Sequence, residues 1–367
     1  METRTWIEVD VEKIRRNILK VKNLTGKKIL ASVKCNLYGM GIENVAEKID
    51  DLVDFYGVAC LDEALELKKL NLKKPILIMG SILPENVEQC ILNNIRITLC
   101  NDEIFQKIKK VSTKFQKKAI VHIKVDTGLG RIGFREKEII PFIEKIIKFK
   151  GIEIEGLFSH FATSESKDKT YAKYQLNTFK KIVNKVENLV KIPIKHIANS
   201  GGVLNLPESY QNFDMVRVGL LLLGVYPAKY LANKVKFDCA IKGFTRIAFI
   251  KNVEKSTPLS YGLSFITKRK TKVATCNIGY GDGLRRDLSN KFWLKLNGKK
   301  VKIIGNICMD QTLIDVTGKN VKIGDIIEIF GDNFEIETMA EICNTVPQEI
   351  LCGFGSKRVK KIYIYGR

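Results

Sequence analysis

Strand-like and helical segments alternate along the first two thirds of this 367-residue sequence, and this alternation most constrains its fold. The helical segments, such as 62–70, 102–111, 136–149 and 171–190, repeat apolar residues at helical spacing. Short apolar runs predict strands near residues 28–34, 54–59, 75–80, 95–100, 119–125, 153–160, 194–198 and 213–218. Eight strands alternating with helices over about 230 residues predict a closed (β/α)8 barrel, with a doubly wound open sheet as the main alternative.

The pattern changes after about residue 235, where short runs separated by turn residues predict a mostly β region with one helix near 337–343. The strands of this region are expected near residues 235–253, 273–278, 292–296, 301–304, 312–316 and 326–329. We therefore predict two domains, a (β/α)8 barrel over residues 1–235 and a β-rich C-terminal domain over 236–367. The first strand, 5–10, is a candidate for packing with the C-terminal domain.

Composition indicates a soluble globular protein, with 45% hydrophobic and 28% charged residues. No apolar run is long enough to span a bilayer, and the sequence starts METRTW without an apolar signal segment. We therefore expect a cytoplasmic protein without membrane association. The nine cysteines include no Cys-x-x-Cys pair, which argues against a disulfide framework and against a zinc site.

The formal charge of +22 raises the question of a nucleic-acid partner. The basic residues are spread along the chain, and the densest run, 268–270, falls between two strand-like segments. No array of aromatic residues accompanies them to stack on bases. We therefore predict that the protein binds no nucleic acid.

The carboxyl ends of barrel strands carry the chemistry in this fold, and several reactive side chains fall there. Lys34 ends the first strand, and Tyr38 follows in the loop. Lysine forms Schiff bases with carbonyl compounds, and burial lowers its pKa toward the range of the free amine. A lysine at a strand end can equally extend into solvent. The other strand ends contribute Lys124, a Gly-rich segment with Arg131, His160, the segment 196–202, and Arg217.

The loops after the seventh and eighth strands commonly bind phosphate in this fold. The segments 200–202 and 219–220 suit such a site. A lysine nucleophile beside a phosphate cradle indicates pyridoxal phosphate. The sequence contains no P-loop, no G-x-S-x-G and only three histidines, so neither those sites nor a metal centre is predicted. Alone, His160 is more simply a core histidine and Arg131 an ion-pair partner; their joint placement at strand ends favours a site.

Motifs along nearly the whole chain carry a resemblance to a known family. They are TWIEVD (5–10), VKCNLYG (33–39), KVDTG (124–128), FSHFA (158–162), ANS (198–200), SYG (260–262), IGYGDG (278–283) and CMDQ (308–311). In order and spacing they resemble the pyridoxal-phosphate-dependent alanine racemases. The resemblance implies an isomerase that interconverts L- and D-alanine, supplies D-alanine for peptidoglycan, and works as a homodimer with shared active sites.

The resemblance also implies roles for individual residues. Lys34 would hold the cofactor and act as one base, and Tyr261 from the partner subunit would act on the opposite face of the substrate. Two bases are needed because the proton leaves one face and returns to the other. The implied cofactor-binding residues are Lys34, Tyr38, His160, Asn199, Ser200, Arg217, Gly219 and Leu220. Those implied at the substrate carboxylate are Arg131 and the backbone of Met309, with Lys124 carbamylated in many family members.

The sequence also departs from the family pattern at several positions, and two of them, Asn306 and Lys357, bear on substrate choice. Leu223 stands where the family usually has tyrosine, Asn306 where it has arginine, and Lys357 near a usual pocket tyrosine. A serine or broad-specificity racemase therefore stays open as the first alternative. A barrel amino-acid decarboxylase and a non-catalytic cofactor-carrying protein are further alternatives. The β-rich region and Tyr261 argue against the non-catalytic one.

Overall fold

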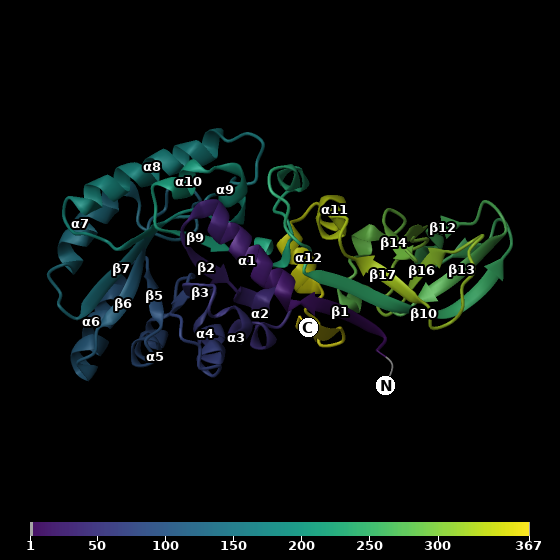
Figure 1. Cartoon of the computed structure of the whole chain (residues 1–367), viewed down its shortest axis with the longest axis horizontal. Coiled ribbons are helices and arrows are strands. Elements are labelled where there is room, and N and C mark those ends of the chain that lie inside the picture. The colour runs from purple at the N-terminus through teal and green to yellow at the C-terminus, as the bar shows by residue number, and fades with distance from the viewer. Residues whose placement is uncertain (1–2, 367) are drawn as a thin grey trace.

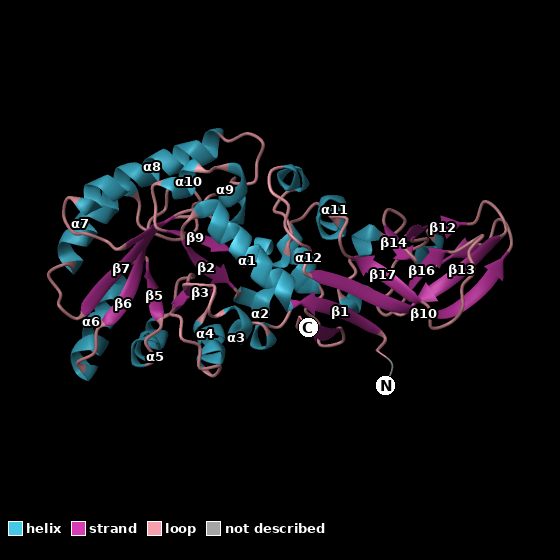
Figure 2. Cartoon of the chain, in the orientation of Figure 1, coloured by secondary structure: helices cyan, strands magenta, loops and turns pink. Residues whose placement is uncertain are grey.

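The computed structural model describes residues 3–366 and consists of two units that lie side by side along the longest axis (Figure 1). Helices surround the strands of the first unit, whereas the second is mostly strand (Figure 2). The helices α1 and α12 lie where the two units meet (Figure 1). None of the described helices has the length and apolar character required to cross a bilayer.

The first unit is an eight-stranded barrel of parallel strands in sequential order. Its strands are β2 (Lys28–Ser32), β3 (Phe55–Val58), β4 (Ile76–Ile78), β5 (Arg96–Leu99), β6 (Ala119–Lys124), β7 (Ile152–Phe158), β8 (Ile194–His196) and β9 (Met215–Val218). β2 pairs with both β3 and β9. Backbone hydrogen bonds from Asp214 to Lys195 and from Arg217 to Ala198, both 2.9 Å, close the barrel. The barrel prediction is therefore confirmed, and the open sheet is excluded.

Helices and helical turns flank the barrel strands, and the longer ones are amphipathic and cover the outside of the barrel. They are α1 (Val11–Thr25), α2 (Lys34–Tyr38), α3 (Ala46–Ile49), α4 (Leu61–Lys68), α5 (Val87–Leu92), α6 (Asp102–Phe115), α7 (Glu136–Ile146), α8 (Thr170–Glu187), α9 (Ser200–Asn205) and α10 (Glu208–Gln211). Helix α6 shows how the sequence determines where such a helix starts and which face it buries. Asn101 caps its start by accepting a hydrogen bond from the amide of Ile104, and its apolar residues at helical spacing are buried.

Successive residues of each barrel strand face opposite sides, as the two-residue period of a strand requires. In β2, Ile29 and Ala31 pack into the main core, whereas Leu30 joins a separate cluster. That second cluster contains Leu30, Phe55, Leu77, Ile194 and Met215 from five different strands, with Met79 beside it. It is an apolar layer inside the barrel.

The second unit is a twisted sheet with short helices. Its elements are β1 (Thr5–Asp10), β10 (Ile241–Val253), β11 (Pro258–Leu259), β12 (Phe265–Ile266), β13 (Thr271–Cys276), β14 (Trp293–Leu296), β15 (Lys299–Lys302), β16 (Thr312–Asp315), β17 (Ile326–Phe330), β18 (Lys360–Ile364), α11 (Glu335–Ile342) and α12 (Pro347–Gly353). The first strand, β1, lies between β10 and β18, antiparallel to the former and parallel to the latter. The strand 5–10 is therefore part of this sheet.

Two local features differ from the sequence prediction. The first barrel strand ends at Ser32, so Lys34 lies in the turn that follows it. One helix was predicted near the C-terminus, but two are present, because α12 follows α11. Val346 and Pro347 provide the start signal for α12, since proline suits the first helical position.

Candidate active site

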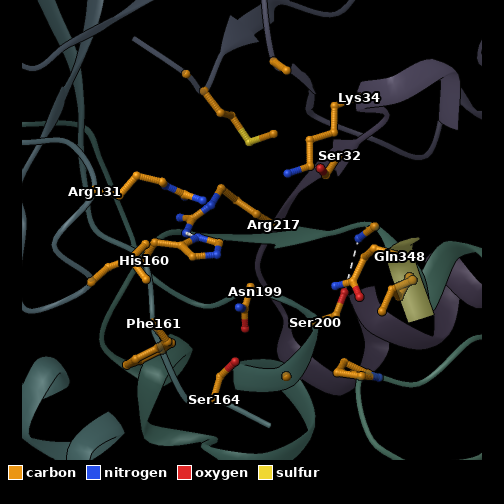
Figure 3. A pocket seen from close by; sticks show the side chains of 18 of the residues that line it. Ser32, Lys34, Arg131, His160, Phe161, Ser164, Asn199, Ser200, Arg217 and Gln348 are labelled. Carbon is orange, nitrogen blue, oxygen red and sulfur yellow. Dashed lines mark hydrogen bonds between the residues drawn. The ribbon is translucent and has the colours of Figure 1, made fainter. Parts of the chain in front are cut away.

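A cavity of about 550 Å³ opens at the carboxyl ends of the barrel strands. Side chains from seven of the predicted positions line it: Lys34, Tyr38, Lys124, Arg131, His160, Ser200 and Arg217. Asn199, Gly219 and Leu220 line it as well. Figure 3 shows Lys34 and Ser32 on one wall, Arg131 and His160 on another, and Arg217 between them. The predicted strand-end residues therefore meet in one place.

Lys34 is held by an unusual turn. The four residues after it, Cys35 to Tyr38, all have left-handed backbone angles, with φ between 51° and 55°. Each such residue costs about 1–2 kcal/mol in an L-amino-acid chain. Glu63 supports the start of the turn by accepting hydrogen bonds from the amides of Cys35 and Ala59, at 2.6 and 2.7 Å. Backbone strain of this kind is typical of functional sites, where the surrounding structure maintains it.

The turn directs Lys34 and Tyr38 to different parts of the cavity. Burial, together with the nearby Arg131, lowers the pKa of Lys34 and so enriches the free amine. Tyr38 packs against the backbone of Gly219, where a Cβ atom would stand 2.0 Å from the phenol oxygen. Burial raises the pKa of Tyr38 to about 12, so its phenol is a hydrogen-bond donor at neutral pH.

Arg131 lies in the Gly-rich loop between β6 and α7. The carboxylate of Asp126 accepts hydrogen bonds from the amides of Gly128, Leu129 and Gly130, at 2.9 to 3.1 Å. Gly133 closes the loop at φ 120°, against the backbone of residues 125 and 126. These bonds fix the loop, so Arg131 extends from a rigid base.

Lys124 is buried at the end of β6, and its amino group lies 4.5 Å from the centre of the Phe158 ring. Burial and the positive charges of Arg217 and Arg131 lower the pKa of Lys124 well below its usual value. The amine is therefore nucleophilic and surrounded by cations, and the position favours a negatively charged group.

Arg217 occupies the centre of the barrel mouth on β9. Its NH2 group donates to the carbonyls of Ser159 and Ile197 and to Nδ1 of His160, at 2.7, 3.0 and 3.0 Å. Burial and the nearby Arg131 lower the pKa of Arg217 to about 9, which leaves it a cation at neutral pH. Burial and the charge of Arg217 lower the pKa of His160 well below its usual value. The histidine is therefore a neutral acceptor.

The loops after β8 and β9 form the opposite wall. Asn199 caps α9, because its side-chain oxygen accepts from the amide of Gly202 at 2.9 Å. Ser200 accepts from the amide of Gly219 at 3.2 Å. Leu220 is buried beside them. This wall offers hydroxyl and amide groups to an anion, as the sequence predicts.

Tyr261 and Met309 lie in the C-terminal sheet unit and not in the cavity. Tyr261 is in the short 3-10 turn Tyr261–Leu263, and its side chain is 71% exposed. Met309 is 52% exposed. Leu263, in the same turn, and Ile266, just after it, are also exposed, so this part of the second unit presents an apolar face. One chain therefore places one predicted base in the cavity and the other on an outer surface.

Comparison with known proteins gives the same family throughout the chain. Family models described as the N-terminal and C-terminal domains of alanine racemase match residues 9–227 and 240–363. Alanine racemase 1 of Caldanaerobacter subterraneus subsp. tengcongensis is 40% identical over 375 residues, covering 98% of this chain and 95% of the relative. The chain belongs to the alanine racemase family.

Solved alanine racemases share the fold over almost the entire chain. The enzyme of Clostridium difficile 630 has a TM-score of 0.91 at 33% identity, covering 99% of this chain and 96% of its own. The Bartonella henselae structure with covalently bound pyridoxal phosphate has a TM-score of 0.91 at 29% identity, covering 99% and 100%. The resemblance, the fold class and the isomerase class predicted from the sequence are therefore confirmed.

The three departures from the alanine racemase pattern have different surroundings. Asn306 donates a hydrogen bond of 2.7 Å to the carbonyl of Tyr261, so it supports the turn that presents that tyrosine. Leu223 is fully buried, away from solvent. Lys357 is exposed, outside the cavity. Among the three, Asn306 has the most direct connection to a proposed catalytic residue.

Sequence reasoning missed several residues that line the cavity of this alanine racemase homologue. They are Gln348 of α12 and Val346 just before that helix, with Ser164 and Glu165 from the loop after β7. The expectation that functional residues lie at the carboxyl ends of barrel strands finds none of them. The helix α12 belongs to the other unit, and Glu165 lies well beyond the end of β7. Pro347 could have indicated the start of this second helix, but not its contact with the barrel. Within residues 3–366, no group of three or more metal-ligating side chains gathers in one place.

Proposed function

We propose that this chain is a pyridoxal-phosphate-dependent racemase that interconverts L- and D-alanine by a two-base mechanism. The observation that carries the proposal is the cavity in which a lysine of lowered pKa meets Arg131 and Arg217. Family membership over the whole chain agrees with it. The division of the chain into a barrel over 1–235 and a C-terminal domain over 236–367, with β1 in the second sheet, is part of the same proposal.

The cofactor prediction is confirmed by the family and by the Bartonella henselae structure with covalently bound pyridoxal phosphate. The residues present here fit that group. Lys34 provides the amine, and the Ser200 and Tyr38 wall provides donors for the phosphate. Arg217 uses NH1 and NH2 for its hydrogen bonds to the protein, so Nε is left for the pyridine nitrogen. Bound pyridoxal phosphate supplies an aldehyde for the substrate amine and an electron-withdrawing ring.

Residues of the protein then remove the α-proton of the substrate and return it. Lys34 accepts or donates it on one face of the substrate, and Tyr261 of the partner subunit does so on the other. Arg217 keeps a positive charge at neutral pH near the ring nitrogen, which would disfavour protonation of that nitrogen and so limit side reactions. Arg131 and the backbone of Met309 hold the substrate carboxylate, because guanidinium and amide donors match its two oxygens.

We propose that the enzyme is a homodimer with two shared sites, because Tyr261 and Met309 lie on an exposed apolar face. In a symmetric dimer each subunit provides the same surface, so both cavities are completed together. We propose that the enzyme works in the cytoplasm and supplies D-alanine for peptidoglycan. Exposed apolar residues on this face agree with a buried interface in the dimer.

Lys124 is proposed to carry a carbamate that positions Arg131. The neutral amine attacks carbon dioxide and loses a proton, and the resulting anion lies among cations. In 13C-bicarbonate at pH about 8, where free amines react, we expect one protein-bound carbamate carbon per chain in the 13C spectrum. Lys124→Ala should remove it, whereas Lys118→Ala, before the same strand, should not. The same signal in both variants contradicts the assignment.

The test of the function is chiral chromatography after incubation with pyridoxal phosphate and, separately, L-alanine, L-serine and L-lysine. We expect L-alanine to convert to an equal mixture of enantiomers, with little D-serine or D-lysine. D-serine at a comparable rate supports the serine or broad-specificity alternative and directs attention to Asn306. No D-product from protein that has bound the cofactor rules out the proposed reaction.

A further inference from the structure

The three histidines of this sequence all lie in one line of hydrogen bonds inside the barrel. Arg217 contacts His160 on one side, and its NH1 group contacts Nδ1 of His196 at 2.8 Å on the other. Nε2 of His196 contacts Nδ1 of His122 at 2.9 Å. Nε2 of His122 contacts the carboxylate of Glu155 at 3.0 Å. The line therefore connects the cavity to a carboxylate on β7.

The two ends of this line fix its direction. A guanidinium only donates hydrogen bonds, and a carboxylate only accepts them. Nδ1 of His196 must therefore accept from Arg217, which places the ring proton on Nε2. That proton is donated to Nδ1 of His122, whose own proton is on Nε2 and is donated to Glu155. Both histidines are thus neutral and in the Nε2–H form.

The surrounding structure is shaped for this line. A Cβ atom on Gly156 would stand 2.3 Å from Nδ1 of His122, so only glycine leaves room for the ring. Phe158 stacks on His196 with 4.8 Å between ring centres and 1° between ring planes. Both histidines are fully buried. The imidazole rings consequently have little freedom to turn and exchange their partners.

The far end of the line is an ion pair. Arg96, at the start of β5, donates to both carboxylate oxygens of Glu155 from Nε and NH2, each at 3.1 Å. The two side chains are 19% and 15% exposed, so the pair lies near the amino-terminal end of the barrel. Arg96 thereby holds in place the Glu155 carboxylate, the acceptor that sets the direction of each hydrogen bond between Glu155 and Arg217.

We propose that Glu155 and Arg96 are positioning residues that act through His122 and His196 to hold the Arg217 side chain in place in the cavity. The role of Arg217 rests on the proposed function, but the hydrogen-bond line itself does not. An additional proton on His122 or His196 would set two donors against each other and break a bond in the line. Arg217 is therefore kept as a donor and held in one orientation.

The charges around the line agree with neutral rings. The groups that face it are Arg96, Glu155, Arg217, Lys124 and Arg131. Burial, opposed by Glu155, lowers the pKa of His122, and burial with Arg217 lowers the pKa of His196. Burial disfavours the Glu155 carboxylate, but hydrogen bonds from His122 and Arg96 outweigh it and lower its pKa to about 2.

Histidine-selective 15N labelling tests the line without reference to activity, because the chain contains only three histidines. We expect all three in the purified protein to be neutral Nε2–H forms from about pH 5.5 to 8, a range in which a free histidine titrates. A titrating signal, or an Nδ1–H form of His122 or His196, overturns the proposed direction.

Substitution at Glu155 tests the positioning role in the cofactor-loaded enzyme. Glu155→Leu removes the acceptor at the far end of the line and should lower kcat by about 10- to 100-fold, the range found where outer hydrogen-bond partners orient the ligands of metal sites. KM should change less, because Arg131 holds the substrate carboxylate. Glu155→Gln retains an acceptor and should restore part of the rate. Glu153→Gln, at an exposed position of the same strand, is the control and should match the unsubstituted enzyme.

The 15N spectra of these variants separate failure of the proposal from failure of the proposed function. Altered ring forms of His122 and His196 in Glu155→Leu, together with a reduced kcat, support positioning. Altered ring forms with an unchanged kcat and unchanged pH profile overturn it. If the protein has no racemase activity at all, the spectra still decide whether the line exists. Should Glu155→Leu fail to fold, Glu155→Gln and the unsubstituted protein provide the same readouts.

Discussion

Replacing Lys34 by alanine is expected to abolish covalent attachment of the cofactor and to lower racemase activity by at least about 10⁴-fold. The substitution removes both the amine that binds the aldehyde and one of the two proposed bases. The cavity retains Tyr38, Ser200 and Arg131, so the phosphate and carboxylate groups can still be bound. Borohydride reduction followed by intact-mass measurement should show the added mass of the cofactor in the unsubstituted protein and not in the variant.

Lys28→Ala is the matched control, because Lys28 is an exposed lysine on β2, the strand that precedes the Lys34 turn. It should keep the added mass and full activity. Cofactor that remains covalently attached in Lys34→Ala would show that another lysine forms the bond. Lys124 is the obvious candidate in that event, since burial lowers its pKa as well.

Substituting Tyr261 by phenylalanine is expected to lower racemisation by about 10²- to 10⁴-fold, the usual contribution of a general acid or base. The ring is retained, and only the phenol oxygen is lost. Racemisation alone does not identify the affected face, because both directions share one equilibrium. Exchange of the α-proton in heavy water, measured separately for each enantiomer, does. One enantiomer should exchange much more slowly than before, and the other should be slowed far less.

The two inactive variants together test whether the sites are shared. If Tyr261 completes the cavity of its partner, a dimer of one Lys34→Ala chain and one Tyr261→Phe chain has one intact site and one site lacking both bases. Co-expression at equal levels should therefore restore about one quarter of full activity, since about half of the dimers are mixed and each has one working site. No recovery from mixed dimers, or a fully active monomer by sedimentation, contradicts shared sites.

The sequence predicts most of the barrel site because one rule, chemistry at strand ends, applies to many residues at once. Lys34, His160 and Arg217 come from distant segments, and closure of the barrel is sufficient to bring them together. The backbone at Lys34 was not predictable in the same way. Left-handed angles usually require glycine, but Cys35 and the three residues after it are not glycines, and tertiary contacts hold them there.

The hydrogen-bond line from Arg217 to Glu155 was also beyond sequence reasoning. His122 lies in the middle of a strand that reads as apolar, and nothing in its neighbours distinguishes it from an ordinary core residue. Its partner on β7 depends on a register shift between Val121 and His122 in the pairing of β6 with β7. Such a shift changes which side chains meet inside the barrel. Pattern alone does not locate it.

The position of β1 has a consequence for how the protein is made. β1 pairs with β10 and β18, so it leaves the ribosome before the whole barrel, whereas its two partners follow the barrel. The barrel is thus an insertion whose two ends are tied to one sheet, and its strands are all synthesised before that sheet can form. Domains generally fold as they emerge. The strand β18, which is made long after the barrel begins, therefore completes a sheet around β1.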